Sequence, residues 1–70
     1  MKQLAQAVKR SIETDAYAQA ECTLAEFSRF VVRMGCEYHR DGEDRYDVWS
    51  FGRTQTPWRL TVTIKEPKND

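Results

Sequence analysis

Two thiols and one imidazole are the side chains of this 70-residue sequence that come nearest to a metal site. They belong to Cys22, Cys36 and His39. A zinc site needs three or four such ligands at defined spacing, and the chain has no Cys-x-x-Cys pair. Strand alternation would also direct Cys36 and His39 to opposite faces of a sheet. We therefore expect no metal and no cofactor, and two reduced cysteines that act as small apolar side chains.

Residues for nucleophilic or acid–base catalysis are equally sparse. His39 is the only histidine. Its possible partners are three serines, Ser11, Ser28 and Ser50, none of them in a Gly-x-Ser-x-Gly motif. The carboxylates of residues 41–44 cluster in a predicted turn, where water screens them and no pocket is expected to enclose them. The chain also lacks a Gly-rich phosphate loop, so we expect no enzymatic activity.

Aromatic and arginine side chains are the remaining chemistry, and they favour binding over catalysis. Tryptophan, tyrosine and arginine dominate the energetics of protein interfaces. The candidate partner or dimer interface comprises Trp49, Phe51, Arg53, Arg59, Arg29 and Arg33. The last two are like charges four residues apart on a predicted helix, where they would meet an acidic partner or a phosphate backbone, or simply face water.

Length and charge set the limits within which these residues act. Seventy residues make one domain with a marginal core, and self-association often helps domains of this size. The 11 basic residues balance 11 acidic ones, whereas nucleic-acid binders usually carry a basic excess. No apolar stretch is long enough for a signal peptide or a membrane span, so we expect a cytoplasmic protein.

Two helices are predicted in the first half of the chain. The second, over residues 24–34, begins at the capping box Thr23-Leu24-Ala25-Glu26 and ends at Gly35. The first is expected over residues 2–20, because apolar residues recur at Leu4, Val8 and Ile12. Its end is open: the helix continues through the alanines of residues 16–20, or it breaks at Thr14-Asp15 and a separate short helix follows over residues 16–21.

Strands are predicted in the second half, where the apolar period falls to two. Residues 58–65 alternate most clearly, with Leu60, Val62 and Ile64 on one face. Further strands are expected over 36–40 and 45–51, and a frayed tail over 66–70. The predicted fold class is α+β: two N-terminal helices packed on a three-stranded antiparallel sheet, in the order α-α-β-β-β.

Strand alternation separates the aromatic residues of the middle strand. If Leu60 and Val62 face the helices, Val48 joins them, and Trp49 and Phe51 point away. Two helices cover only one face of such a sheet, so an apolar patch is left for a partner or a second copy, with Arg59 able to lie over the Trp49 ring. The alternative is a bulge near Asp47 or Ser50 that returns Trp49 to the core.

A winged-helix DNA-binding regulator is the second hypothesis. It needs residues 16–21 as their own helix, so that three helices precede a hairpin, with residues 24–34 as the recognition helix and Arg53 near the wing tip. The first residues of that recognition helix, Leu24, Ala25 and Glu26, are poor readers of DNA bases.

The chain has two structural signals, Thr23-Leu24-Ala25-Glu26 and Trp49-Ser50-Phe51, and a predicted plan of two helices followed by a hairpin. In this plan, in its size and in its charge balance, it resembles small host-takeover proteins of bacteriophages. These include anti-CRISPR proteins and quorum-sensing anti-activators. The resemblance implies stoichiometric inhibition of a host regulatory protein or effector complex through a protein interface, often as a homodimer, in the host cytoplasm. It transfers no functional residue.

Overall fold

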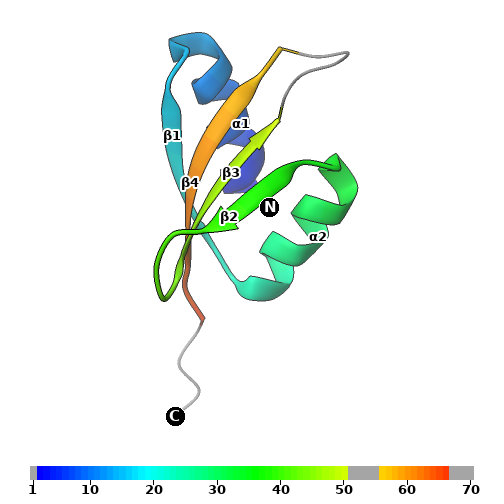
Figure 1. Cartoon of the computed structure of the whole chain (residues 1–70). Helices are drawn as coiled ribbons and strands as arrows, with labels where there is room; N and C mark the ends of the chain where they lie inside the picture. The colour runs from blue at the N-terminus through cyan, green and yellow to red at the C-terminus, as the bar shows by residue number, and fades with distance from the viewer. Residues whose placement is uncertain (1, 51–55, 67–70) are drawn as a thin grey trace.

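A computed structural model describes residues 2–50 and 56–66 and shows two helices with a four-stranded sheet (Figure 1). The elements are α1 (Lys2–Thr14), β1 (Tyr17–Cys22), α2 (Leu24–Met34), β2 (Glu37–Arg40), β3 (Arg45–Ser50) and β4 (Trp58–Ile64). The strands lie in the order β1-β4-β3-β2, with β1 parallel to β4 and the other pairs antiparallel. The α+β class is confirmed, but the three-stranded antiparallel sheet is wrong, because the sheet has a fourth, parallel strand.

Strand β1 is the element that the sequence misassigned. Helix α1 ends at Thr14, where Asp15 takes a left-handed conformation with φ of 53°, so the predicted helix over residues 2–20 is too long. From Tyr17 onward exposed and buried residues alternate, and the buried ones are Ala18, Ala20 and Cys22. Pairing with β4 has overridden the helical preference of alanine. Residues 16–21 are therefore not a helix of any kind, and the three-helix order of a winged helix is wrong.

Helix α2 forms where local signals place it. Thr23 Oγ1 accepts a hydrogen bond from the Glu26 N–H at 3.2 Å, and Glu26 Oε1 accepts one from the Thr23 N–H at 2.9 Å. That second bond lowers the pKa of the Glu26 carboxyl. At the other end Gly35 adopts φ of 61° and donates its N–H to Val31 O at 2.9 Å. The predicted span of residues 24–34, the capping box and the terminal glycine are all confirmed.

The remaining strands agree with prediction to within one residue. Strand β2 begins at Glu37 rather than Cys36, and β4 ends at Ile64. The expected end of the middle strand, residue 51, lies outside the described residues. The first residue of the expected frayed tail is tied down, because Glu66 Oε1 accepts a hydrogen bond from the Leu24 N–H at 2.8 Å.

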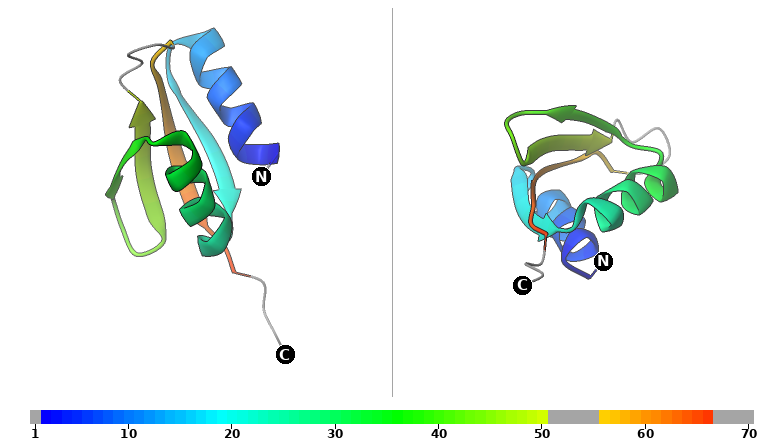
Figure 2. Two further views of the ribbon diagram at one scale, coloured as in Figure 1. Left: turned by 90° about the vertical axis from the view of Figure 1, so that its right-hand side faces the viewer. Right: turned by 90° about the horizontal axis from the view of Figure 1, so that it is seen from below.

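Both helices cover the same face of the twisted sheet (Figure 2). Helix α1 packs on β1 and β4. From α2, Phe27 contacts the rings of Tyr38 and Tyr46, and Phe30 contacts the ring of Trp58. The buried apolar residues form one core: Leu4, Ala7, Ala18, Ala20, Cys22, Phe27, Phe30, Val48, Trp58, Leu60 and Val62. The opposite face of the sheet, which we call the open face, carries no helix among the described residues.

Candidate functional site

A row of three large side chains crosses the open face of the sheet. Trp49 of β3 is paired with Arg59 of β4, and Arg59 is paired in turn with Tyr17 of β1. The neighbouring Val48 is fully buried on the helix side, so Trp49 faces outward, as the alternation predicts. Tyr17 is 53% exposed and Trp49 is half-buried. We call Tyr17, Arg59 and Trp49 the aromatic row.

Arg59 is held against Tyr17 rather than over Trp49. Its guanidinium carbon lies 5.3 Å from the centre of the Tyr17 ring. Nη2 donates to the Asp15 carbonyl oxygen at 2.9 Å and lies 3.8 Å from the Asp15 carboxylate. The prediction placed Arg59 over the Trp49 ring, whereas the structure shows its guanidinium against Tyr17 of β1 and bonded to Asp15 in the turn before β1. Trp49 instead lines a shallow depression with Asp15, Tyr17, Ser50, Pro57 and Arg59.

Ser11 anchors the row from beneath the sheet. The side chain is 2% exposed. Its Oγ donates to the Ala16 carbonyl oxygen at 2.7 Å and accepts a hydrogen bond from the Arg59 N–H at 2.8 Å. One hydroxyl thus joins the end of α1, the turn into β1 and the start of β4. From the sequence alone, Ser11 is considered only as a possible nucleophile. The missed signal is the helical spacing that places Ser11 on the same side of α1 as Leu4 and Ala7.

Replacing Ser11 with alanine should lower the free energy of unfolding by about 1–3 kcal/mol, because two backbone groups lose a buried partner. Denaturant unfolding followed by circular dichroism measures this, with Ser28→Ala on the exposed side of α2 as the matched control. If the two variants unfold at the same denaturant concentration, Ser11 does not join these elements.

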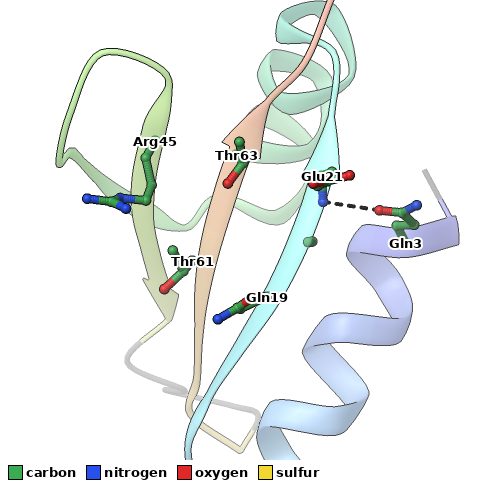
Figure 3. Close-up of a pocket in the computed structure, with 7 residues that line it drawn as sticks. Gln3, Gln19, Glu21, Arg45, Thr61 and Thr63 are labelled. Carbon is green, nitrogen blue, oxygen red and sulfur yellow. Dashed lines mark hydrogen bonds between the residues drawn. The ribbon is translucent and has the colours of Figure 1, made fainter.

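Polar and charged side chains fill the rest of the open face. Figure 3 shows Gln19, Glu21, Thr61, Thr63 and Arg45 around a shallow hollow beside Gln3 of α1. Three cationic side chains of this face each lie near a carboxylate. Lys65 Nζ is 3.3 Å from Glu21 Oε2, Arg45 Nε is 3.6 Å from Asp41 Oδ2, and Arg59 Nη2 is 3.8 Å from Asp15 Oδ1. Such exposed pairs add little stability, but they leave little unbalanced positive charge on the face.

The outer edge of β1 is closed by side chains of α1. Gln3 Oε1 accepts a hydrogen bond from the Glu21 N–H at 3.1 Å (Figure 3), and Arg10 Nη2 donates to the Gln19 carbonyl oxygen at 2.9 Å. These bonds occupy backbone groups that would otherwise pair with another strand. The sheet is thus protected from strand addition at its β1 end.

The other interface residues expected from the sequence do not join the aromatic row. Phe51 and Arg53 lie outside the described residues. Arg29 and Arg33 are exposed on α2, where they line a shallow depression with Ser28 and Val32 on the helix side of the molecule. The structure therefore separates these two arginines from Trp49 by the thickness of the fold.

The cysteine thiols are unpaired and poorly suited to nucleophilic chemistry. Burial, with a smaller contribution from Glu26, raises the pKa of the Cys22 thiol to about 11, and burial also raises that of Cys36. Both thiols therefore stay protonated near neutral pH.

Within residues 2–50 and 56–66, no group of three or more His, Cys, Asp or Glu side chains is placed to hold a metal ion. Neither of the two described helices has the length and apolar character to cross a membrane.

Comparison of the chain with models of known protein families, with curated proteins and with solved structures finds no match.

Proposed function

We propose that this chain is a small, non-enzymatic protein-binding module that meets its partner through the aromatic row. The observation that supports this most directly is the placement of Tyr17, Arg59 and Trp49 side by side on a sheet face that neither described helix covers. Hydrogen bonds from Arg59 to Asp15 and Ser11 hold the row in position before a partner arrives. Preorganised aromatic and arginine side chains lose little entropy on binding and act as hot spots.

The charges around the row favour a protein over a nucleic acid as the partner. A phosphate backbone is attracted by unbalanced positive charge. Here Arg59, Arg45 and Lys65 each lie within 4 Å of a carboxylate, and the whole chain is neutral. A neutral face with an aromatic centre is typical of a protein interface.

Within this class, we favour an inhibitor that covers a working surface of a host regulatory protein or effector complex, as phage anti-CRISPR proteins and anti-activators do. Small size and balanced charge support this, together with an exposed row suited to stoichiometric binding. The plan of two helices and a hairpin no longer supports it, because β1 intervenes between the helices. Such an inhibitor would act in the host cytoplasm.

Trp49→Ala should leave the fold near wild type but weaken partner binding by about 2 kcal/mol or more, roughly thirtyfold, because a central aromatic anchor is lost. The partner is first captured from lysate of the native host and identified by mass spectrometry. Binding of the wild type and variants to the purified partner is then measured by calorimetry. Thr61→Ala on the same face is the control for general disturbance of the sheet.

Two results would contradict the proposal. One is a folded Trp49→Ala variant that binds as tightly as the wild type. The other is binding to DNA or RNA that weakens steeply with added salt, since release of counterions from phosphates is the signature of a nucleic-acid interface.

A further inference from the structure

The two edges of the sheet differ in how they are protected. Side chains of Gln3 and Arg10 close the β1 edge. Strand β2 lies at the opposite edge, on the outside of the molecule (Figure 2). All four of its residues are exposed. An exposed strand edge is a template for pairing with another strand.

The hydrogen-bond pattern shows which backbone groups this edge presents. The Asp41 N–H donates to the Arg45 carbonyl oxygen at 2.8 Å, so these residues form a bonded pair. Bonded pairs alternate along an antiparallel ladder, and His39 is therefore bonded to β3 in the same way. Tyr38 and Arg40 then direct their N–H and C=O groups away from β3, toward the open edge.

An apolar flank of α2 continues this edge on the helix side of the sheet. Leu24 is 49% exposed, Val32 is 83% exposed and Tyr38 is 53% exposed. These three side chains line one groove, together with Phe27, Ser28, Val31 and Tyr46. A strand added to β2 would lie beside Tyr38, and whatever packs beneath that strand would cover Val32.

We propose that β2 pairs with β2 of a second copy of this chain, antiparallel and with Tyr38 opposite Tyr38 on the two-fold axis. In this register the outward N–H and C=O groups of the two Tyr38 residues bond reciprocally. Glu37 then lies directly opposite His39 of the second copy on the open face, so a carboxylate meets a hydrogen-bond donor. A shift by two residues would instead oppose Glu37 with Asp41, two carboxylates that repel.

This self-complementary charge pattern is the reason to choose a second copy over a foreign strand. The apolar flanks of the two α2 helices approach each other beneath the extended sheet, with the small Ser28 allowing close contact. The inference does not rest on the proposed function, because the backbone edge of β2 and the apolar flank of α2 form the dimer contact and Trp49 belongs to neither, although Trp49 lies next to Glu37 on the open face. Trp49→Ala should therefore leave the dimer intact.

Analytical ultracentrifugation tests the dimer and its flank. The wild type should sediment as a dimer, and Val32→Glu should raise its dissociation constant by roughly tenfold or more, because a charge is placed in an apolar contact. Arg33→Glu, at the next position but outside the groove that Leu24, Val32 and Tyr38 line, is the control and should have a smaller effect. A monomeric wild type, or a dimer that Arg33→Glu disrupts and Val32→Glu does not, would overturn the proposal.

Disulfide trapping tests the register. Chains with Glu37→Cys are mixed with chains carrying His39→Cys, both in a Cys36→Ser background, and oxidised mildly. Directly opposed residues of a non-bonded pair lie about 4.5 Å apart at Cα, within disulfide range, so a covalent heterodimer should form. Mixing Glu37→Cys with Asp41→Cys is the matched control for the shifted register. Trapping of the 37–41 pair in preference to the 37–39 pair would show that the proposed pairing is wrong.

Discussion

Phe30→Ala should lower the free energy of unfolding by about 3–5 kcal/mol, the usual cost of removing a buried aromatic ring. The Phe30 side chain is 5% exposed, and its ring centre lies 5.9 Å from that of the buried Trp58. It is therefore a principal contact between α2 and the start of β4. A domain of about 70 residues rarely has more than about 3–5 kcal/mol of stability in total, so much of the variant should be unfolded at room temperature.

Thermal and urea unfolding followed by circular dichroism measure this loss. Arg33→Ala, one turn further along α2 and exposed, is the control and should change stability by less than about 0.5 kcal/mol. A Phe30→Ala variant that unfolds together with the control would mean that the buried side of α2 has been misidentified.

The elements predicted correctly are those whose signals are local. Helix α2 is bounded by its capping box and by Gly35, which lie within the helix or next to it. Strand β4 shows a strict alternation in which Leu60 and Val62 are buried while Arg59 is exposed. Such patterns need no knowledge of distant residues, because each is satisfied by its own neighbours along the chain.

Strand β1 could not be found in this way, because what makes it a strand is distant in sequence. Its short run, Tyr17–Cys22, is rich in alanine, which favours helices in isolation. Its strand partners are in β4, where Ala18 faces Leu60 and Ala20 faces Val62. Ala18 and Ala20 are both buried where α1 packs on β1, so in this fold they serve as core residues of a strand rather than as helix formers.

Missing β1 also explains which part of the candidate site was predicted wrongly. The outward direction of Trp49 follows from alternation along β3 alone. The partners of Arg59 do not, because Asp15 and Tyr17 belong to the turn and strand that were taken for helix. Ser11 was likewise visible as a residue but not as a link, since both of its hydrogen-bond partners depend on β1 being a strand.

Strand β1 can be tested directly by placing aspartate on each of its faces. Ala20 is 6% exposed on the helix side, whereas its neighbour Gln19 is exposed on the open face. Ala20→Asp should be strongly destabilising and Gln19→Asp should be tolerated. Aspartate is equally unfavourable in a strand at both positions, so the difference reports only which face is buried.

The expected size of the Ala20→Asp effect follows from the carboxyl's ionisation. An aspartate with an ordinary pKa near 3.9 must be neutralised or desolvated when it is buried, which costs about 4 kcal/mol at pH 7. Burial raises the pKa in the folded state only, so the loss of stability is present above about pH 4 and grows with pH. Urea unfolding at several pH values should therefore show the stability of Ala20→Asp moving toward that of Gln19→Asp as the pH falls to about 4.

Residues 16–21 in one continuous helix would predict a different pattern, because positions 19 and 20 would then be 100° apart on a single surface and neither would alternate with its neighbours. Equal and pH-independent effects of the two substitutions would therefore contradict the strand, and with it the Asp15–Tyr17 support on which the position of Arg59 depends.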